Sequence, residues 1–273
     1  MNTKVEIFGS PQTIWAPIKP GATVYVGSLV SIDQSALDEG FVVRPTGVGV
    51  SNTTNKDRPF GVCIGTNRRT PVYSATYQAE YITDAGATGI RTDTTEYIMP
   101  EGPWSAGEGR AMIKIAVITP STILRMPIRN NAIGTAISTL TSTAGNANGL
   151  TVTTGACDFT PVANLCSIYA RTGVNAGTYR ITDDTSTTVA TWDVHMKNTT
   201  ATAGDTYVRV PLRTNGVSYV TIGDGTVASF IDASVSPATN YDIIHVLNLN
   251  LAEAGGEYVD FMFDADAFCT NRA

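Results

Sequence analysis

The side chains that could perform acid–base, nucleophilic or metal chemistry are few and lie far apart in this sequence. Its two histidines, His195 and His245, have no Cys, Asp or Glu at the spacing of metal ligands. The sequence contains no GxSxG, HExxH, GxGxxG or P-loop motif, each of which presents a nucleophile, a zinc ion or a nucleotide on a defined turn. His245 falls on the apolar side of an alternating pattern, which indicates a hydrogen-bonded core histidine. We expect no enzymatic activity and no cofactor.

Two acidic pairs are the remaining candidates for a metal site. Asp183 and Asp184 fall in an expected turn, where aspartates bond to their own backbone, and we interpret them as structural. Asp264 and Asp266, two residues apart on an expected strand, would share one face and could bind a hard cation such as Ca²⁺ with loop carbonyls. We prefer the structural interpretation here too, and predict no metal site.

Aromatic residues and cysteines offer two further possibilities. Tyr73, Tyr77 and Tyr81 would share one face of a single strand and, with Trp104, could stack on sugar rings, although cross-strand packing is the commoner use of such a stripe. The four cysteines form no CxxC motif. Cys63 and Cys166 lie in apolar runs and are expected to be buried thiols, which suits a cytoplasm. A disulfide between Cys157 and Cys166 is the alternative.

The composition restricts the class of protein. Only 15% of the 273 residues are charged, against roughly 25% in ordinary globular proteins. A net charge of −6 argues against nucleic-acid binding, which needs clustered Lys and Arg. The N-terminus has no signal-peptide pattern, and no uncharged apolar run approaches the roughly 20 residues of a membrane helix. We expect a protein made in a cytoplasm, without membrane or nucleic-acid partners.

Short alternating segments and glycine-rich turns predict an all-β fold. Residues 1–20, which hold three prolines, should form an extended arm. Residues 21–119 should form a small β-barrel, 120–135 a linker, and 136–273 a β-sandwich or jelly roll.

Individual strands of this fold can be assigned to faces by alternation. Phe60, Val62 and Ile64 should share one face, and SIYAR, TYRIT and TVATWDVHM should be successive strands. In YDIIHVLNLNL a longer set would share one face: Tyr241, Ile243, His245, Leu247, Leu249 and Leu251. The apolar Ile244 and Val246 indicate that the middle of this strand is covered on both sides.

Several segments resemble known phage proteins. GATVYVGSLVSID, RPFGVCIGTN and GEGRAMIKIAVIT resemble the small β-barrels of tailed-phage head decoration proteins, in which an arm precedes G-x-x-V-x-x-G-x-L-V and a P-x-G-V-x-I/V strand follows. VANLCSIYARTGVNAGTYRITDDTSTTVAT is similar to a module frequent in phage virion proteins. The resemblance covers about a third of the chain. It implies a capsid-bound structural protein, often trimeric, and no enzyme.

These observations predict a non-enzymatic virion protein on the capsid surface that cements a phage capsid by binding across major capsid protein subunits. The expected partners are the major capsid protein and two further copies in a homotrimer, with no small-molecule ligand. Four apolar residues of the arm would make the attachment: Ile7, Phe8, Ile14 and Trp15. Packing of the arm on its own barrel is the competing interpretation. The alternative functions are a carbohydrate-binding head fibre or spike module and a tail-tube or adaptor subunit.

Overall fold

The protein is all-β in the part of the chain that the computed structural model describes. That part comprises residues 4–32, 42–43, 59–75, 79–83, 97, 111–128, 140–146, 149–152, 166–170, 176–186, 189–192, 206–211, 216–225, 228–232, 242–252 and 256–268. These residues form antiparallel sheets and one short 3₁₀ helix, η1 (Ala265–Phe268). The predicted fold class is therefore confirmed.

Two sheets are built from the first part of the chain. A five-stranded sheet has the order β2 (Thr13–Pro17), β9 (Met112–Val117), β6 (Gly61–Thr66), β4 (Leu29–Ile32) and β5 (Val42–Val43). A three-stranded sheet has the order β3 (Thr23–Tyr25), β8 (Ala79–Thr83) and β7 (Val72–Ser74). Val24 and Ile82 of the smaller sheet pack with Ile113 and Ile115 of the larger one in a shared apolar cluster.

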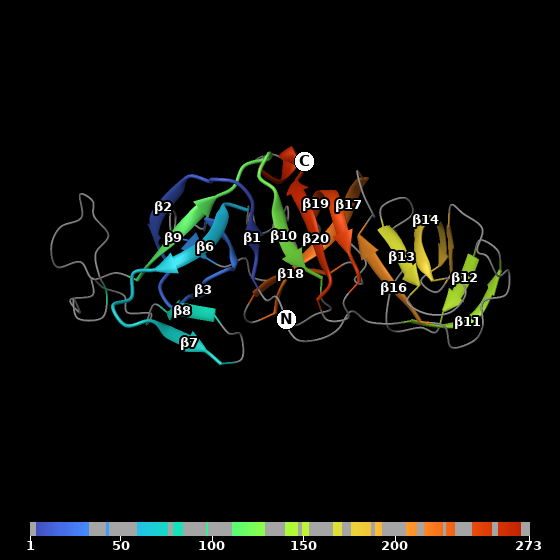
Figure 1. Cartoon of the computed structure of the whole chain (residues 1–273), viewed down its shortest axis with the longest axis horizontal. Coiled ribbons are helices and arrows are strands. Elements are labelled where there is room, and N and C mark those ends of the chain that lie inside the picture. The colour runs from blue at the N-terminus through green and yellow to red at the C-terminus, as the bar shows by residue number, and fades with distance from the viewer. Residues whose placement is uncertain are drawn as a thin grey trace.

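A six-stranded sheet takes strands from distant parts of the sequence. Its order is β1 (Glu6–Ile7), β10 (Leu124–Pro127), β20 (Tyr258–Phe263), β19 (Asp242–Asn250), β17 (Gly216–Gly225) and β18 (Ala228–Asp232). In Figure 1 this sheet lies at the centre, between the N-terminal sheets and a barrel. β10 falls inside the predicted linker 120–135, so part of that stretch is a strand of this sheet.

One apolar cluster joins the six-stranded sheet to the N-terminal part. Leu29, Val62 and Ile118 pack in the same cluster as Phe261 and Ile231. The backbone N–H of Leu29 also donates a hydrogen bond of 2.9 Å to Oγ of Ser229, in β18. The predicted domain boundaries stay predictions, but strand pairing and side-chain packing cross them.

A closed barrel is built from strands in the later part of the chain. It contains β11 (Leu140–Asn146), β12 (Gly149–Val152), β15 (Val189–Trp192), β14 (Gly177–Ser186), β13 (Cys166–Ala170) and β16 (Thr206–Pro211), in that order, and closes by pairing of β16 with β11. The described strands of 21–119 belong to the five-stranded and three-stranded sheets. Because β10 and β17 both belong to the six-stranded sheet, the barrel is an insertion into that sheet's connectivity, and it occupies one end of the molecule (Figure 1).

A β-bulge changes the buried face along β19. Val246 pairs with Phe261 and Asn248 with Asp260, which leaves Leu247 as an extra residue. An extra residue inverts the alternation of side chains beyond it. Ile244 and Val246 are therefore buried before the bulge, and Leu249 packs on the same cluster after it. The single face predicted from Tyr241 to Leu251 was wrong for this reason.

Candidate functional site: the N-terminal arm and the face it joins

The N-terminal arm lies along two sheets of its own chain. β1 pairs with β10, and β2 pairs with β9 through five residue pairs from Thr13↔Ala116 to Pro17↔Met112. The N–H of Val5 donates to the carbonyl of Gly27 at 2.8 Å, and the N–H of Phe8 to that of Ile123 at 3.0 Å. The extended conformation predicted for residues 1–20 is present in residues 4–19, and the described contacts of these residues are with their own chain. Attachment of the arm to another chain stays a prediction.

The four predicted attachment residues divide between the core and the surface. Ile7 packs against the cluster of the six-stranded sheet, and Trp15 is half-buried in β2 opposite Lys114. Phe8 is 42% exposed and Ile14 39% exposed. Ile123, which receives the bond from Phe8, is 36% exposed. The arm therefore presents apolar side chains outward while others of its residues fill its own cores.

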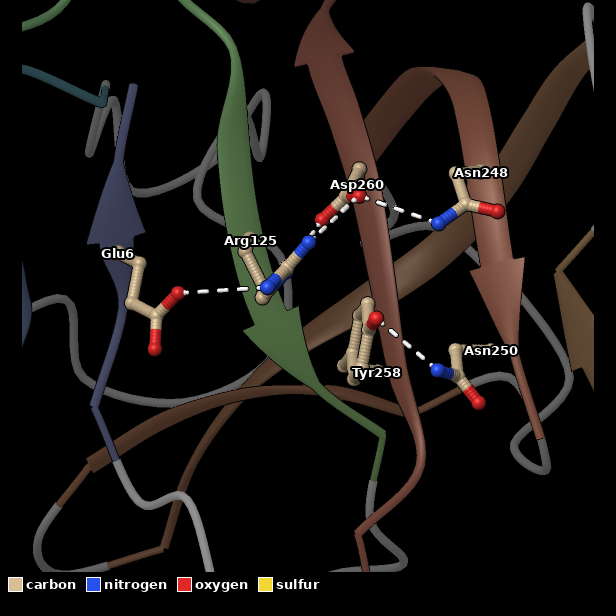
Figure 2. A network of polar contacts seen from close by, with 6 residues as sticks. All are labelled: Glu6, Arg125, Asn248, Asn250, Tyr258 and Asp260. Carbon is tan, nitrogen blue, oxygen red and sulfur yellow. Dashed lines mark hydrogen bonds and ion pairs between the residues drawn. The ribbon is translucent and has the colours of Figure 1, made fainter. Parts of the chain in front are cut away.

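A row of polar side chains crosses β1, β10, β20 and β19 (Figure 2). Glu6, Arg125 and Asp260 occupy paired positions on β1, β10 and β20, and Asn248 on β19 pairs with Asp260. The strand neighbours of Arg125 and Asp260 are buried because alternate residues of a strand point to opposite faces: Leu124, Met126, Val259 and Phe261.

Arg125 is the hub of this row. Its Nε and Nη2 donate to the two carboxylate oxygens of Asp260 at 2.7 and 3.0 Å, and its Nη1 lies 3.6 Å from Oε2 of Glu6. The guanidinium carbon lies 4.1 Å from the ring centroid of Tyr258 and 5.1 Å from that of Phe8. The hydrogen bonds to Asp260 raise the pKa of Arg125 above its ordinary value. This side chain is thus held by a two-pronged ion pair and two rings, one of which belongs to the arm.

Two asparagines complete the row on β19. Nδ2 of Asn248 donates to Asp260 Oδ2 at 3.2 Å, and Nδ2 of Asn250 donates to the hydroxyl of Tyr258 at 2.9 Å. The groups of this face satisfy one another, so we interpret it as a clamp that orders the sheet and the arm rather than as a reactive centre.

Sequence reasoning missed Arg125 because it placed the residue in a linker. A usable signal existed: in LRMP the apolar Leu124 and Met126 flank one charged residue, the alternation of a half-buried strand. The partners Asp260 and Glu6 are 135 and 119 positions away from Arg125 in the sequence. No local pattern could have paired them.

His245 lies on the polar face, not in the core. Its Nε2 is 2.7 Å from Oδ2 of Asp264, and its side chain is 41% exposed. The prediction of a core histidine was wrong because the buried positions before the bulge are Ile244 and Val246. Asp264 follows the end of β20 and precedes η1, so Asp264 and Asp266 are not two positions of one strand.

The other candidates for metal or redox chemistry are placed as follows. Asp183 and Asp184 lie within β14, next to register shifts, rather than in the predicted turn. Nowhere in the described ranges do three or more His, Cys, Asp or Glu side chains gather closely enough to hold a metal ion. The residues His195, Cys157 and Cys269 lie outside the described residues, as does the side chain of Asp266.

Cys63 is a buried thiol, as predicted. It is fully buried, it donates to the carbonyl of Gly65 at 3.6 Å, and it is free. Burial raises the pKa of the Cys63 thiol to about 12. A thiol that stays protonated at neutral pH is a poor nucleophile, so this cysteine serves packing. Cys166 lies in β13, but the environment of its side chain is outside the described part.

The predicted aromatic stripe does not form on one strand. The chain turns back between β7 and β8, so that Val72 pairs with Tyr81 and Tyr73 with Glu80. Tyr73 and Tyr81 therefore face opposite sides of the three-stranded sheet. Tyr73 is 68% exposed, whereas Tyr81 packs on Tyr25 with ring centroids 5.5 Å apart. Tyr77 and Trp104 lie outside the described residues.

Comparisons with known proteins identify no relative: no protein family, no curated protein and no solved structure matches this chain. Among the described residues, no helix has the length and apolar character that crossing a membrane requires.

Proposed function

We propose that this chain is a non-enzymatic structural protein of a phage virion, which decorates and cements the capsid by binding across major capsid protein subunits. The observation that carries the proposal is the position of β2. This strand of the arm is at the edge of the five-stranded sheet, where β9 is its one partner among the described strands.

An edge strand suits attachment for two reasons. Its outward backbone groups can pair with a strand of another chain, and its side chains supply the specificity. Ile14, in β2, is exposed and apolar, and Trp15 beside it is half-buried. The resemblance of the adjoining segments to phage decoration proteins points to the major capsid protein as the other chain.

The same reasoning supports a homo-oligomer, for which we propose a trimer on the capsid surface. Open sheet edges template association, and closed symmetry covers them. The net charge of −6 and the low content of Lys and Arg support a protein partner over nucleic acid.

Binding of purified chain to heads that lack it tests the proposal. Ile14→Lys places a charge on the exposed part of the edge strand, and should weaken the affinity for heads by about 30-fold if Ile14 contributes roughly 2 kcal/mol. Tyr73→Lys is the matched control, because Tyr73 is also large, apolar and exposed but lies in β7 of the other sheet. It should bind as the unaltered chain does.

Electron microscopy of labelled particles supplies the second test. Label on the capsid surface supports decoration, whereas label confined to tails would identify a tail-tube or adaptor subunit and overturn the proposal. Equal head binding by the Ile14→Lys and unaltered proteins would show that β2 is not the attachment edge.

A further inference from the structure

Residues 4–8 lie in a slot between Gly27 and the edge of β10, and this slot accommodates an extended segment. Gly27 forms part of it, with φ of +92°, and a Cβ at this position would lie 2.7 and 2.8 Å from Cγ and Cβ of Lys4. The remainder is the edge of β10, which receives β1 through the pairs Glu6↔Arg125 and Ile7↔Leu124. The slot thus requires a glycine where the arm crosses it.

The contacts of this segment are those of an extended peptide added to a sheet edge. Backbone bonds run from Val5 to Gly27 and from Phe8 to Ile123. Val5 is buried in the central cluster and Ile7 packs against it, as alternate side chains of one extended segment do. Glu6 lies on the other face, against Arg125. Main-chain bonds with alternating apolar anchors are the physical basis of strand addition.

An exposed hinge joins this segment to the rest of the chain. Phe8, Gly9 and Ser10 are exposed, and Gly9 has φ of +95° with nothing within 4 Å of the position that a Cβ would take. Pro11 follows. A glycine in open space can change its backbone angles without a steric cost, so residues 4–8 can swing away from their own slot while β2 stays paired.

Apolar side chains flank this hinge. Phe8 at its start, Ile14 just beyond it and Ile123 beside the slot are three of the exposed large apolar side chains in the described part of the chain. After exchange, Phe8 of one copy and Ile123 of the other would lie side by side at the junction between the copies, because both lie at the slot.

We propose that residues 4–8 of one copy dock in the slot of a second copy, so that copies of this chain are joined by exchange of the first strand. This proposal rests on one part of the proposed function, the homo-oligomer, and does not depend on capsid binding. Exchange of an identical segment needs no new recognition surface, since the slot already fits it.

The length of the hinge limits the geometry. Gly9 to Gln12 is a span of four residues, which can bridge at most roughly 14 Å when fully extended. The slots of exchanging copies must therefore lie close together, so the complex is a compact closed oligomer in which the copies touch near β1 and β10.

A cysteine pair tests the exchange on the full-length chain in solution, without heads. Phe8→Cys with Ile123→Cys places thiols at positions joined by the backbone bond across the slot. After oxidation, a non-reducing gel and intact mass should show covalent dimers or higher species. The single variants report any pairing with the natural cysteines.

The matched control is Trp15→Cys with Lys114→Cys, a pair in register between β2 and β9, beyond the hinge. It should give crosslinked protein of monomer mass. The proposal is overturned if the 8/123 pair gives monomer mass only or no crosslink, or if the 15/114 pair also joins separate chains.

Native mass spectrometry of the unaltered chain gives an independent readout that does not depend on how the variants fold. Oligomers at micromolar concentration are expected, and monomer alone would overturn the proposal. Heads are absent from both experiments, so a negative result would overturn strand exchange without testing capsid binding. The binding of Ile14→Lys to heads decides the proposed function separately.

Discussion

Gly27→Ala tests how much the close contact between Gly27 and Lys4 stabilises the docked arm. The new Cβ would lie 2.7 to 3.2 Å from the Cβ, Cγ and Cδ atoms of Lys4. Ordinary carbon–carbon contacts are about 3.5–4.0 Å, so residue 4 must shift by about 1 Å. Two of these atoms are close to the Lys4 backbone, so rotation of the distal side chain cannot relieve the contact.

The magnitude follows from a comparison with Gly9→Ala. Both glycines have φ above +90°, so an alanine costs about 1–2 kcal/mol of backbone strain at each. Only Gly27 adds the contact with Lys4, since the space at Gly9 is open. Overpacking of this kind costs about 1–3 kcal/mol, which is the expected excess of Gly27→Ala over Gly9→Ala.

Hydrogen exchange of the Val5 and Phe8 amides is the suitable assay, because their backbone bonds hold the arm. An excess of about 1.4 kcal/mol predicts about tenfold faster exchange at both amides in Gly27→Ala than in Gly9→Ala. Amides of β19, remote from Lys4 in the sheet, should be unchanged. Equal exchange at Val5 in the two variants would refute the argument that close packing on Gly27 seats the arm.

Three further predictions concern the cores and the clamp. Gly61→Ala would place a Cβ 2.3 Å from Cγ2 of Ile115 and 2.5 Å from the carbonyl oxygen of Ala116. It should therefore destabilise the fold by about 3 kcal/mol. In the control Gly65→Ala the nearest atom would be 3.8 Å from the new Cβ, so the melting temperature should change little. Arg125→Met removes both bonds to Asp260 and should cost about 2 kcal/mol in urea unfolding, after allowance for the partial exposure of the pair; an unchanged midpoint would contradict the clamp. Because the pKa of Cys63 is raised in the folded protein, the thiol of the unfolded chain, with a pKa of 9.0, ionises at lower pH than the folded one. The contribution of Cys63 to stability is therefore complete below pH 9 and falls by about 1.4 kcal/mol by pH 10. Cys63→Ala should lack this alkaline loss when the two unfolding free energies are compared across pH.

Alternation predicted the strands better than it predicted their faces. The segments FGVCIGTN, GRAMIKIAVIT and SIYAR, which alternation indicates as strands, contain or overlap β6, β9 and β13. The face assignments failed where a residue was inserted. In β6 the register shifts between Cys63 and Gly65, and Ile64 is 41% exposed although alternation grouped it with Val62. Leu247 has the same effect in β19. A bulge leaves the composition of a strand unchanged, so periodicity alone does not reveal it.

Long-range pairing was the other limit of sequence reasoning. β10 is four residues long, and its partners β1 and β20 come from opposite ends of the sequence. The pair Arg125–Asp260 depends on that register, and a one-residue slip would place the two side chains on opposite faces.

Burial of Cys63 could be predicted because the five-stranded sheet contributes to two apolar clusters. Val62 enters one cluster and Cys63 the other, so the local run is apolar on both faces.

The arm shows why its role could not be settled by composition. Prolines and isolated apolar residues predict an extended segment that adds to a sheet edge, and Pro17 at the last position of β2 is compatible with an edge strand. Backbone bonds at an edge are nearly independent of sequence, so the same pattern suits an edge of the same chain or of another. Val5 lies in the cluster of the six-stranded sheet, and Ala16 and Ile18 in that of the N-terminal sheets. An arm that contributes to two cores of one chain, and is divided by an exposed glycine, has the physical properties needed for both intramolecular packing and exchange. Whether the arm packs on its own chain or exchanges therefore depends on the hinge at Gly9 rather than on the apolar residues of the arm.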